Sequence, residues 1–299
     1  MNNNNYSLSQ PYDQLVSSFE ERSGVMWCYA NPSPRPCFTP QLLRDLLRFL
    51  NNIRARCINE SNAGVFPDVK YLILGSYKPG IFSLGGDLAL FVGAIKDKDK
   101  VQLSEYMRLS IDVLYATYTN LNAPLTTIAL IRGNALGAGF EGALACDYLI
   151  AEEGVQLGFP EVLFNMFPGM GAYSFLSRKI NQVMVEKMIL GGRVYKSEEL
   201  HEMGIIDSIA KKGQGVEETR EYIKRLEKNG NTRRSLLKVR NRVSPVSYQE
   251  LIDIGEIWVE AALSLTAREL KIMERFIRAQ DKMAKSLVDT VNLKETVNS

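Results

Sequence analysis

Short apolar runs of strand length alternate with amphipathic helical patterns through the first two thirds of this 299-residue chain. The strand-like runs are residues 24–30, 69–75, 125–131, 147–151 and 205–209, and the helical patterns are residues 39–53, 103–121, 137–146, 182–190 and 197–203. Many brief strands mixed with helices are typical of an α/β core built from repeated units. We therefore expect an α/β fold, although no repeat with a clean period is visible in the sequence.

The pattern changes after residue 210, where long and charged helical segments begin. The last of them runs from residue 248 to about residue 288, and its apolar stripe can pack on the core or on another subunit. The first residues are Asn-rich and polar, which is typical of a mobile tail. The sequence thus predicts three parts: a disordered tail (residues 1–13), the core (14–209) and a C-terminal helical region (210–299).

The counts of histidine and cysteine restrict the chemistry. The one histidine, His201, lies in a short helical segment of exposed character, so a His-ligated metal cluster is excluded. Acid–base catalysis near neutral pH therefore falls to carboxylates. The four cysteines (Cys28, Cys37, Cys57 and Cys146) are widely spaced and form no CxxC pair. We expect reduced thiols, no metal site and a cytoplasmic protein.

The charge is nearly balanced, with a formal net charge of +2. Nucleic acid is therefore not expected as the main partner. No stretch is long enough to cross a bilayer and no leader pattern is present, so we expect a soluble protein without membrane contact. Between Ser208 and Pro245, however, eleven Lys or Arg face four Glu, a local excess of +7. This excess fits either a solvated helical face or the docking of an acidic partner or a phosphorylated carrier.

Two glycine-rich loops are candidates for binding a polarised oxygen. The first is FSLGGDL (82–88), and the second, GNALGAGFEG (133–142), opens a helix directly after a predicted strand. Such a turn leaves backbone N–H groups free at the start of the helix. The second loop also spells GxGxxG, but the helix that follows is too short for a dinucleotide-binding unit. The glycines instead allow a flat substrate carbonyl to approach the backbone.

Two glutamates are candidates for a general acid and a general base. Glu141 interrupts an apolar run of small residues, and Glu161 follows the segment LGFP (157–160). An unpaired carboxylate in apolar surroundings either faces water or is buried for a functional reason, because burial of the charge is costly. Both lie beside glycine-lined turns, which favours a catalytic pair.

These motifs, in this order, resemble those of the crotonase (enoyl-CoA hydratase/isomerase) superfamily. The likeness covers roughly residues 24–210 and rests on FSLGGDL (82–88), RGNALGAGFE (132–141), ACD (145–147), LGFPE (157–161) and GGRVYKSEE (191–199) leading to MGIID (203–207). The resemblance implies a crotonase-like spiral of ββα turns, a C-terminal helical oligomerisation region, and a trimer or a dimer of trimers. It also implies acyl thioester substrates, with the oxyanion hole formed by the N–H groups of Leu84 and Ala138 and catalysis by Glu141 and Glu161.

Within the superfamily, the chain is most similar to the synthases of diffusible signal factor, the cis-2-unsaturated fatty acids of bacterial quorum sensing. The likeness rests on the N-terminal extension, the residues 27–38 that end in PRPCF, the segments FPE (159–161) and FPGMG (167–171), and the helix that bears Trp258. It implies dehydration of a 3-hydroxyacyl thioester on acyl carrier protein, followed by hydrolysis to the free 2-enoic acid. No cofactor or metal is implied, and a cognate signal-sensor protein is a further expected partner.

The same resemblance implies an apolar site for the acyl chain. Its expected lining residues are Gly85, Leu136, Gly137, Met170, Gly171, Trp258 and Phe276, and we expect Phe276 to close the far end. For each apolar residue, ordinary core packing is the alternative. Two other functions also fit the motifs: an enoyl-CoA hydratase of fatty-acid metabolism, and a non-catalytic binding protein with the same fold.

Overall fold

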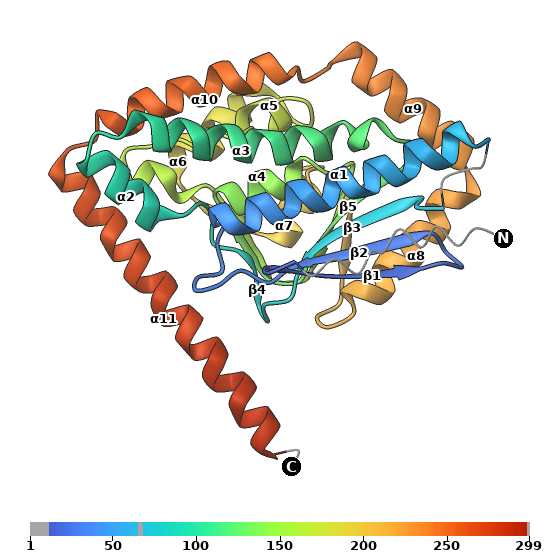
Figure 1. Ribbon diagram of the computed structural model, residues 1–299, viewed down its shortest axis with the longest axis horizontal. Coiled ribbons are helices and arrows are strands. Elements are labelled where there is room, and N and C mark those ends of the chain that lie inside the picture. Colours follow the sequence, from blue (N-terminus) through green and yellow to red (C-terminus); the bar gives the residue numbers. More distant parts are fainter. Residues whose placement is uncertain (1–11, 65–67, 298–299) are drawn as a thin grey trace.

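The computed structural model describes residues 12–64 and 68–297, with side chains as far as residue 284. Its larger sheet has six strands in the order β1–β2–β3–β5–β7–β10 (Figure 1). These strands are β1 (Leu15–Glu20), β2 (Val25–Ala30), β3 (Tyr71–Ser76), β5 (Thr126–Ile131), β7 (Tyr148–Glu152) and β10 (Ser208–Ala210). β1 pairs antiparallel with β2, and all other pairs in this sheet are parallel.

A smaller sheet has four strands in the order β4–β6–β8–β9. They are β4 (Ile81–Ser83), β6 (Asn134–Leu136), β8 (Gln156–Gly158) and β9 (Val194–Lys196). The pairs β3/β4, β5/β6 and β7/β8 each give their first strand to the larger sheet and their second to the smaller one. A helical segment follows each pair, so the chain forms the spiral of ββα turns that the motifs predict.

Helices follow the strand pairs and cover the spiral (Figure 1). The helical segments before the C-terminal region are α1 (Pro40–Asn62), α2 (Leu88–Lys96), α3 (Lys100–Tyr118), η1 (Asn120–Asn122), α4 (Ala138–Leu144), η2 (Pro160–Phe164), α5 (Ala172–Leu176), α6 (Gln182–Gly191) and α7 (Ser197–Glu202). Thr39 caps α1 by accepting a hydrogen bond from Leu42 N, with Pro40 in the first turn, and this start agrees with the sequence prediction.

The larger sheet is covered on both faces. Alternate residues of a strand point to opposite faces, so each central strand contributes side chains to two cores. In β5, Ile128 and Leu130 pack against one face, where α8 (Gly215–Lys228) contributes Ile223 and Leu226. Ala129 and Ile131 belong to the main core on the opposite face, with residues of α1, α3 and α4. All six residues of β5 are buried, and the lack of a regular polar–apolar alternation in residues 125–131 follows from this double coverage.

The C-terminal region differs from the sequence prediction in one respect. Residues 248–288 do not form a single helix, because α10 (Tyr248–Leu263) ends before α11 (Ala267–Val297) begins. Thr266 starts α11 as a capping box: its N–H donates to the Glu269 carboxylate at 2.7 Å. α10 packs along α3, and α11 crosses α2 and extends away from the body of the molecule (Figure 1). α9 (Gly230–Val243) lies at the opposite end.

The structure also bears on the cysteines, the histidine and the predicted tail. All four cysteines are free and buried, and His201 is exposed, as the sequence predicts. Residues 1–11 of the predicted tail lie outside the described residues, whereas Tyr12 packs edge-on against Phe49. Among the described residues, no helix combines the length and the apolar character needed to span a membrane.

Candidate active site

A cavity of about 220 Å³ lies where the start of α4, the turn before α2, η2, α10 and α11 meet. The structure brings the predicted site residues together here: the lining includes Leu84, Gly85, Leu136, Gly137, Ala138, Glu141, Glu161, Met170, Trp258 and Phe276. Gly171 is the exception, since it does not line the cavity and instead precedes α5. Apart from the two glutamates, the wall is largely apolar.

The turn from β6 into α4 is built from small residues because it is packed tightly. Gly137 adopts a positive φ of 54°, and a Cβ on this residue would lie 2.2 Å from Oε1 of Glu161. A Cβ on Gly139 would lie 2.7 Å from Ser83. The glycines of the GxGxxG pattern therefore serve close packing, and Gly137 leaves room for a carboxylate.

Glu141 is held in place by backbone donors. Its side chain is almost fully buried, and Oε1 accepts hydrogen bonds from the N–H groups of Met170 and Ala172, each at 2.9 Å. Burial raises the pKa of Glu141 to about 7, and the backbone hydrogen bonds act in the opposite direction. The left-handed φ of 147° at Gly171 lets the chain turn so that both donors reach the same oxygen.

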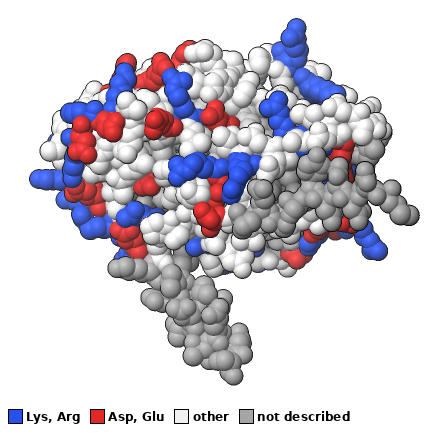
Figure 2. Space-filling view, in the orientation of Figure 1, with Lys and Arg blue, Asp and Glu red and all other residues white. Residues whose placement is uncertain are grey.

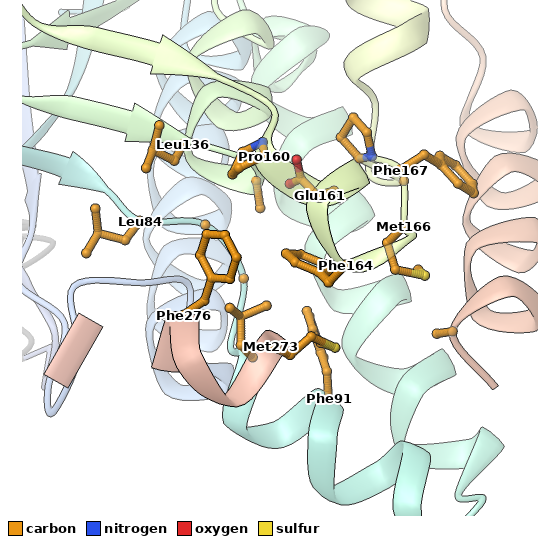
Figure 3. A pocket seen from close by; sticks show the side chains of 18 of the residues that line it. Leu84, Phe91, Leu136, Pro160, Glu161, Phe164, Met166, Phe167, Met273 and Phe276 are labelled. Carbon is orange, nitrogen blue, oxygen red and sulfur yellow. The ribbon is translucent and has the colours of Figure 1, made fainter. Parts of the chain in front are cut away.

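Glu161 occupies the same cavity with less support. It lies in the first turn of η2, and Figure 3 shows its carboxylate pointing into the pocket, close to Pro160 and above Phe164. Its Oε2 is buried and has no hydrogen-bond partner among the described residues. Burial, and after it the charge of Glu141, raises the pKa of Glu161 to about 8. Both pKa values are therefore raised toward neutral pH, the range that suits a general acid and a general base.

The oxyanion-hole prediction needs a correction. The Leu84 N–H already donates to Pro36 O at 2.8 Å, so the prediction that Leu84 supplies a donor is wrong. Gly86, two residues later, lines the cavity, and its N–H has no hydrogen-bond partner within the described part of the chain. Ala138 begins α4, where N–H groups lack intrahelical acceptors. Gly86 and Ala138 are therefore the available donors.

The two donors lie on adjoining segments. A Cβ on Gly85 would lie 3.3 Å from Leu136 O and 3.9 Å from Ala138 N. A Cβ on Gly86 would lie 2.8 Å from the Phe91 ring. A side chain at Gly85 would thus crowd the gap between this turn and α4, whereas one at Gly86 would collide with Phe91 of α2. The glycine pair marks this turn in the sequence. Which of its N–H groups is free depends on a contact from a distant segment, because Pro36 O already accepts the Leu84 N–H.

The apolar wall extends from the carboxylates toward α2 and α10. Trp258 packs edge-on against Phe91 with ring centroids 5.0 Å apart. A Cβ on Gly169 would lie 2.4 Å from the Trp258 ring, so only glycine leaves room for the indole. Phe276 also lines the cavity and packs edge-on against Phe164, with ring centroids 5.6 Å apart (Figure 3). That it closes the far end of the cavity stays a prediction. These walls suit an apolar chain.

The basic excess between Ser208 and Pro245 lies elsewhere. None of the described residues that line the cavity comes from this segment. Figure 2 shows basic side chains over α9, at the opposite end of the molecule from α2 and α11. Several cations of the segment pair locally, as Arg220 does with Glu20, Arg225 with Glu218 and Arg240 with Asp147. Among the described residues, no group of three or more His, Cys, Asp or Glu is arranged to hold a metal ion.

Comparison with known proteins agrees with this geometry. The sequence profile of the enoyl-CoA hydratase/isomerase family matches residues 29–253. The chain belongs to this family. It is 30% identical over 199 residues to "Putative enoyl-CoA hydratase/isomerase YngF" of Bacillus subtilis (strain 168), covering 66% of this chain and 69% of that protein. The match to rat "Methylglutaconyl-CoA hydratase, mitochondrial" is 32% identical over 146 residues, 49% of this chain and 44% of that protein.

The chain thus spans less than half the length of that hydratase. Among solved structures, an enoyl-CoA hydratase from Mycobacterium avium subsp. paratuberculosis K-10 superposes with a TM-score of 0.71. The sequence identity is 16%, and the match covers 91% of this chain and 98% of the other. This likeness establishes the crotonase fold.

Proposed function

We propose that this enzyme of the crotonase family dehydrates a 3-hydroxyacyl thioester to the cis-2-enoyl thioester and then hydrolyses it to the free acid. The observation that carries the proposal is the pair of buried glutamates, Glu141 and Glu161, in one apolar cavity. Beside them lie the N–H groups of Gly86 and Ala138, for which the described residues provide no hydrogen-bond acceptor. A thioester carbonyl seated between these donors has its α-carbon next to two carboxyl groups with raised pKa values.

The dehydration follows from this arrangement. The two N–H donors stabilise the enolate oxygen, and loss of one such donor typically costs about 100- to 1000-fold in rate. One carboxylate removes the α-proton, and the other carboxyl group gives its proton to the 3-hydroxyl, which leaves as water. The pair suits this exchange because one member is neutral while the other is ionised near neutral pH. The product is the 2-enoyl thioester.

The hydrolysis uses the same groups. A carboxylate activates a water molecule, whose oxygen bonds to the thioester carbonyl carbon while the N–H donors hold the oxyanion. The carbon–sulfur bond then breaks, and the thiol leaves with a proton from the same carboxyl pair. A single cavity therefore supports both steps.

The segment that resembles the signal synthases is joined to this site. Pro36 O accepts the Leu84 N–H, Phe38 N donates to Gly85 O at 2.9 Å, and Phe38 forms a β-bridge with Gly86. The PRPCF segment thus shapes the glycine turn, which supports the finer proposal of a quorum-sensing signal synthase. We propose with it a substrate borne on acyl carrier protein, a homo-oligomer such as a trimer, and a cytoplasmic location.

The second candidate is an enoyl-CoA hydratase, favoured by the names of the relatives. Both functions use the same carboxylate pair, so the product decides between them. Purified protein is incubated with a medium-chain 3-hydroxyacyl carrier protein, and the products are identified by mass spectrometry. Free 2-enoic acid that depends on both glutamates is the expected result. Enoyl thioester without free acid would instead identify a hydratase, and no conversion would favour a binding protein.

A further inference from the structure

Gln280 is a buried polar residue that the proposed reaction does not use. It lies on α11, is only 5% exposed and lines the cavity. Its Nε2 donates a hydrogen bond to Leu84 O at 3.0 Å. Its Oε1 is buried and has no hydrogen-bond partner among the described residues. Native proteins rarely leave such an atom unpaired, so this oxygen requires an explanation.

The orientation of the Gln280 amide is fixed by chemistry. The Leu84 carbonyl can only accept a hydrogen bond, so the NH₂ group must face it and Oε1 must point away from it. Exchanging the two ends would place two acceptors together and leave the NH₂ group without its partner. The unpaired atom is therefore an acceptor, and the group that satisfies it must be a donor.

Neighbouring contacts hold this part of α11 in place. Arg35 Nε pairs with Asp281 Oδ1 at 2.6 Å, one residue beyond Gln280. One turn earlier, Phe276 packs against Phe164 of η2. These contacts fix the helix on both sides of Gln280, so its amide is presented on a rigid element.

The position of Gln280 relative to the donors identifies the part of a substrate that reaches it. The gap for the carbonyl oxygen lies between the Gly85–Gly86 turn and the start of α4, and Glu161 lies on the Gly137 side of that gap. Gln280 is bonded to Leu84, and Figure 3 shows Leu84 and Glu161 on different sides of the pocket. A carbonyl whose α-carbon faces the carboxylates directs its sulfur toward Leu84.

We propose that Gln280 binds the thiol arm of the substrate: its Oε1 accepts a hydrogen bond from the amide N–H nearest the thioester sulfur. This inference rests on the acyl thioester substrate of the proposed function. The amide belongs to the pantetheine arm, which coenzyme A and a carrier protein share. Gln280 therefore binds the arm in either substrate and does not distinguish coenzyme A from carrier protein. The residue thereby sets the position of the thioester along the cavity.

The test uses two small substrates that differ in one group. One is a medium-chain 2-enoyl thioester of N-acetylcysteamine, and the other carries an ester oxygen in place of the amide N–H. Hydration of each is followed by loss of the enoyl absorbance. We expect the wild-type protein to favour the amide by about 3- to 10-fold in kcat/KM, chiefly through KM, since one neutral hydrogen bond is at stake. In Gln280→Met, both substrates are expected to react equally well.

Asp281→Asn is the matched control. It weakens the attachment of α11 to Arg35 but leaves the Gln280 amide, so the preference for the amide substrate should persist. A wild-type protein without this preference, or a Gln280→Met variant that keeps it, would overturn the inference. With coenzyme A and carrier-protein substrates, the Gln280→Met variant should lose the same factor on both; a loss on only one would also contradict the role in arm binding.

This readout is separate from the proposed synthase activity. If enoyl hydration occurs without release of free acid, the synthase proposal fails while the Gln280 comparison still stands. If neither small substrate reacts, the dissociation constants of two matched ketones, with methylene in place of sulfur, are measured by calorimetry. The same 3- to 10-fold preference is then expected for the amide ketone, and equal binding would refute the inference.

Discussion

Glu141 and Glu161 face one cavity from two differently built regions. Glu141 lies in a helix, and its Oε1 receives the N–H groups of Met170 and Ala172. Glu161 lies in a short 3-10 turn, and its Oε2 has no partner in the described part of the chain. Burial raises the pKa of both, but only Glu141 has main-chain donors that favour its charged form. The fold thus stabilises a negative charge on Glu141, whereas burial without such donors favours the protonated form of Glu161.

The strongest test of this comparison removes each ionisable group in turn. Glu141→Gln and Glu161→Gln are each expected to lower kcat by about 100- to 10,000-fold, the usual contribution of a general acid or base. The amide oxygen that replaces the Glu141 carboxylate can still accept from the Met170 N–H, so the fold is preserved. Steady-state kinetics on a 3-hydroxyacyl thioester measures the effect, with the exposed Glu105→Gln as control. Near-normal rates in both variants would exclude a catalytic pair.

A second change perturbs only Glu161, the carboxylate whose Oε2 has no hydrogen-bond partner among the described residues. Gly137→Ala would place a methyl group 2.2 Å from Glu161 Oε1 and would also strain a residue at φ 54°. Displacement of a catalytic group by about 1 Å can cost on the order of 100-fold in rate, and we expect a loss of this size in kcat/KM. The control is Gly93→Ala on α2, where a Cβ meets nothing within 4 Å. Equal activity of the two variants would show that Glu161 is free to move.

The pH dependence of the rate tests the two carboxyl groups as a coupled pair. The pair is expected to titrate with apparent pKa values near 7 and near 8, so the active form, with one proton shared between the two groups, is most populated between them. The profile of kcat/KM should be bell-shaped and fall about tenfold per pH unit on each side. A rate profile that is flat from about pH 5 to about pH 9 would contradict the raised pKa values.

The sequence predicts the larger sheet better than the smaller one. The strands β2, β3, β5 and β7 of the larger sheet are mostly buried and stand out in the sequence, whereas β4, β6, β8 and β9 have three residues each and show no period. The break between α10 and α11 is hidden because apolar spacing continues through Leu265. Thr266 and Glu269 spell the capping box that marks it.

Within the site, side chains are easier to identify than backbone donors. A glutamate in an apolar segment is conspicuous, so Glu141 and Glu161 can be found directly. A free N–H has no signature in the sequence, and nothing there indicates that Pro36 accepts the Leu84 hydrogen bond while Gly86 stays free. Gln280 gives no signal either, since its role depends on where α11 crosses the cavity. Long-range contacts decide these roles.

The smallest expected effect concerns the free energy of unfolding, which the burial of Glu161 in the cavity lowers when its carboxyl group is ionised in the unfolded chain. A carboxyl group whose pKa is raised in the folded state binds its proton more tightly there than in the unfolded chain. Its contribution to the free energy of unfolding is therefore fully present below about pH 4.5 and is lost as the pH rises through about 8. Glu161→Gln removes this dependence, so the variant should gain stability relative to the wild type across that range. Because each pKa unit corresponds to about 1.4 kcal/mol, and Glu141 remains in place, we expect a relative gain of about 1–3 kcal/mol.

Urea unfolding of both proteins at about pH 5 and about pH 8 measures this difference. The exposed Glu105→Gln serves again as the control, since this side chain lies on the surface and outside the cavity. A constant difference between Glu161→Gln and the wild type at both pH values would mean that Glu161 is ionised and solvated when folded. In that case both carboxylates would be ionised in the folded protein, and Glu161 would not be the protonated partner of an ionised Glu141.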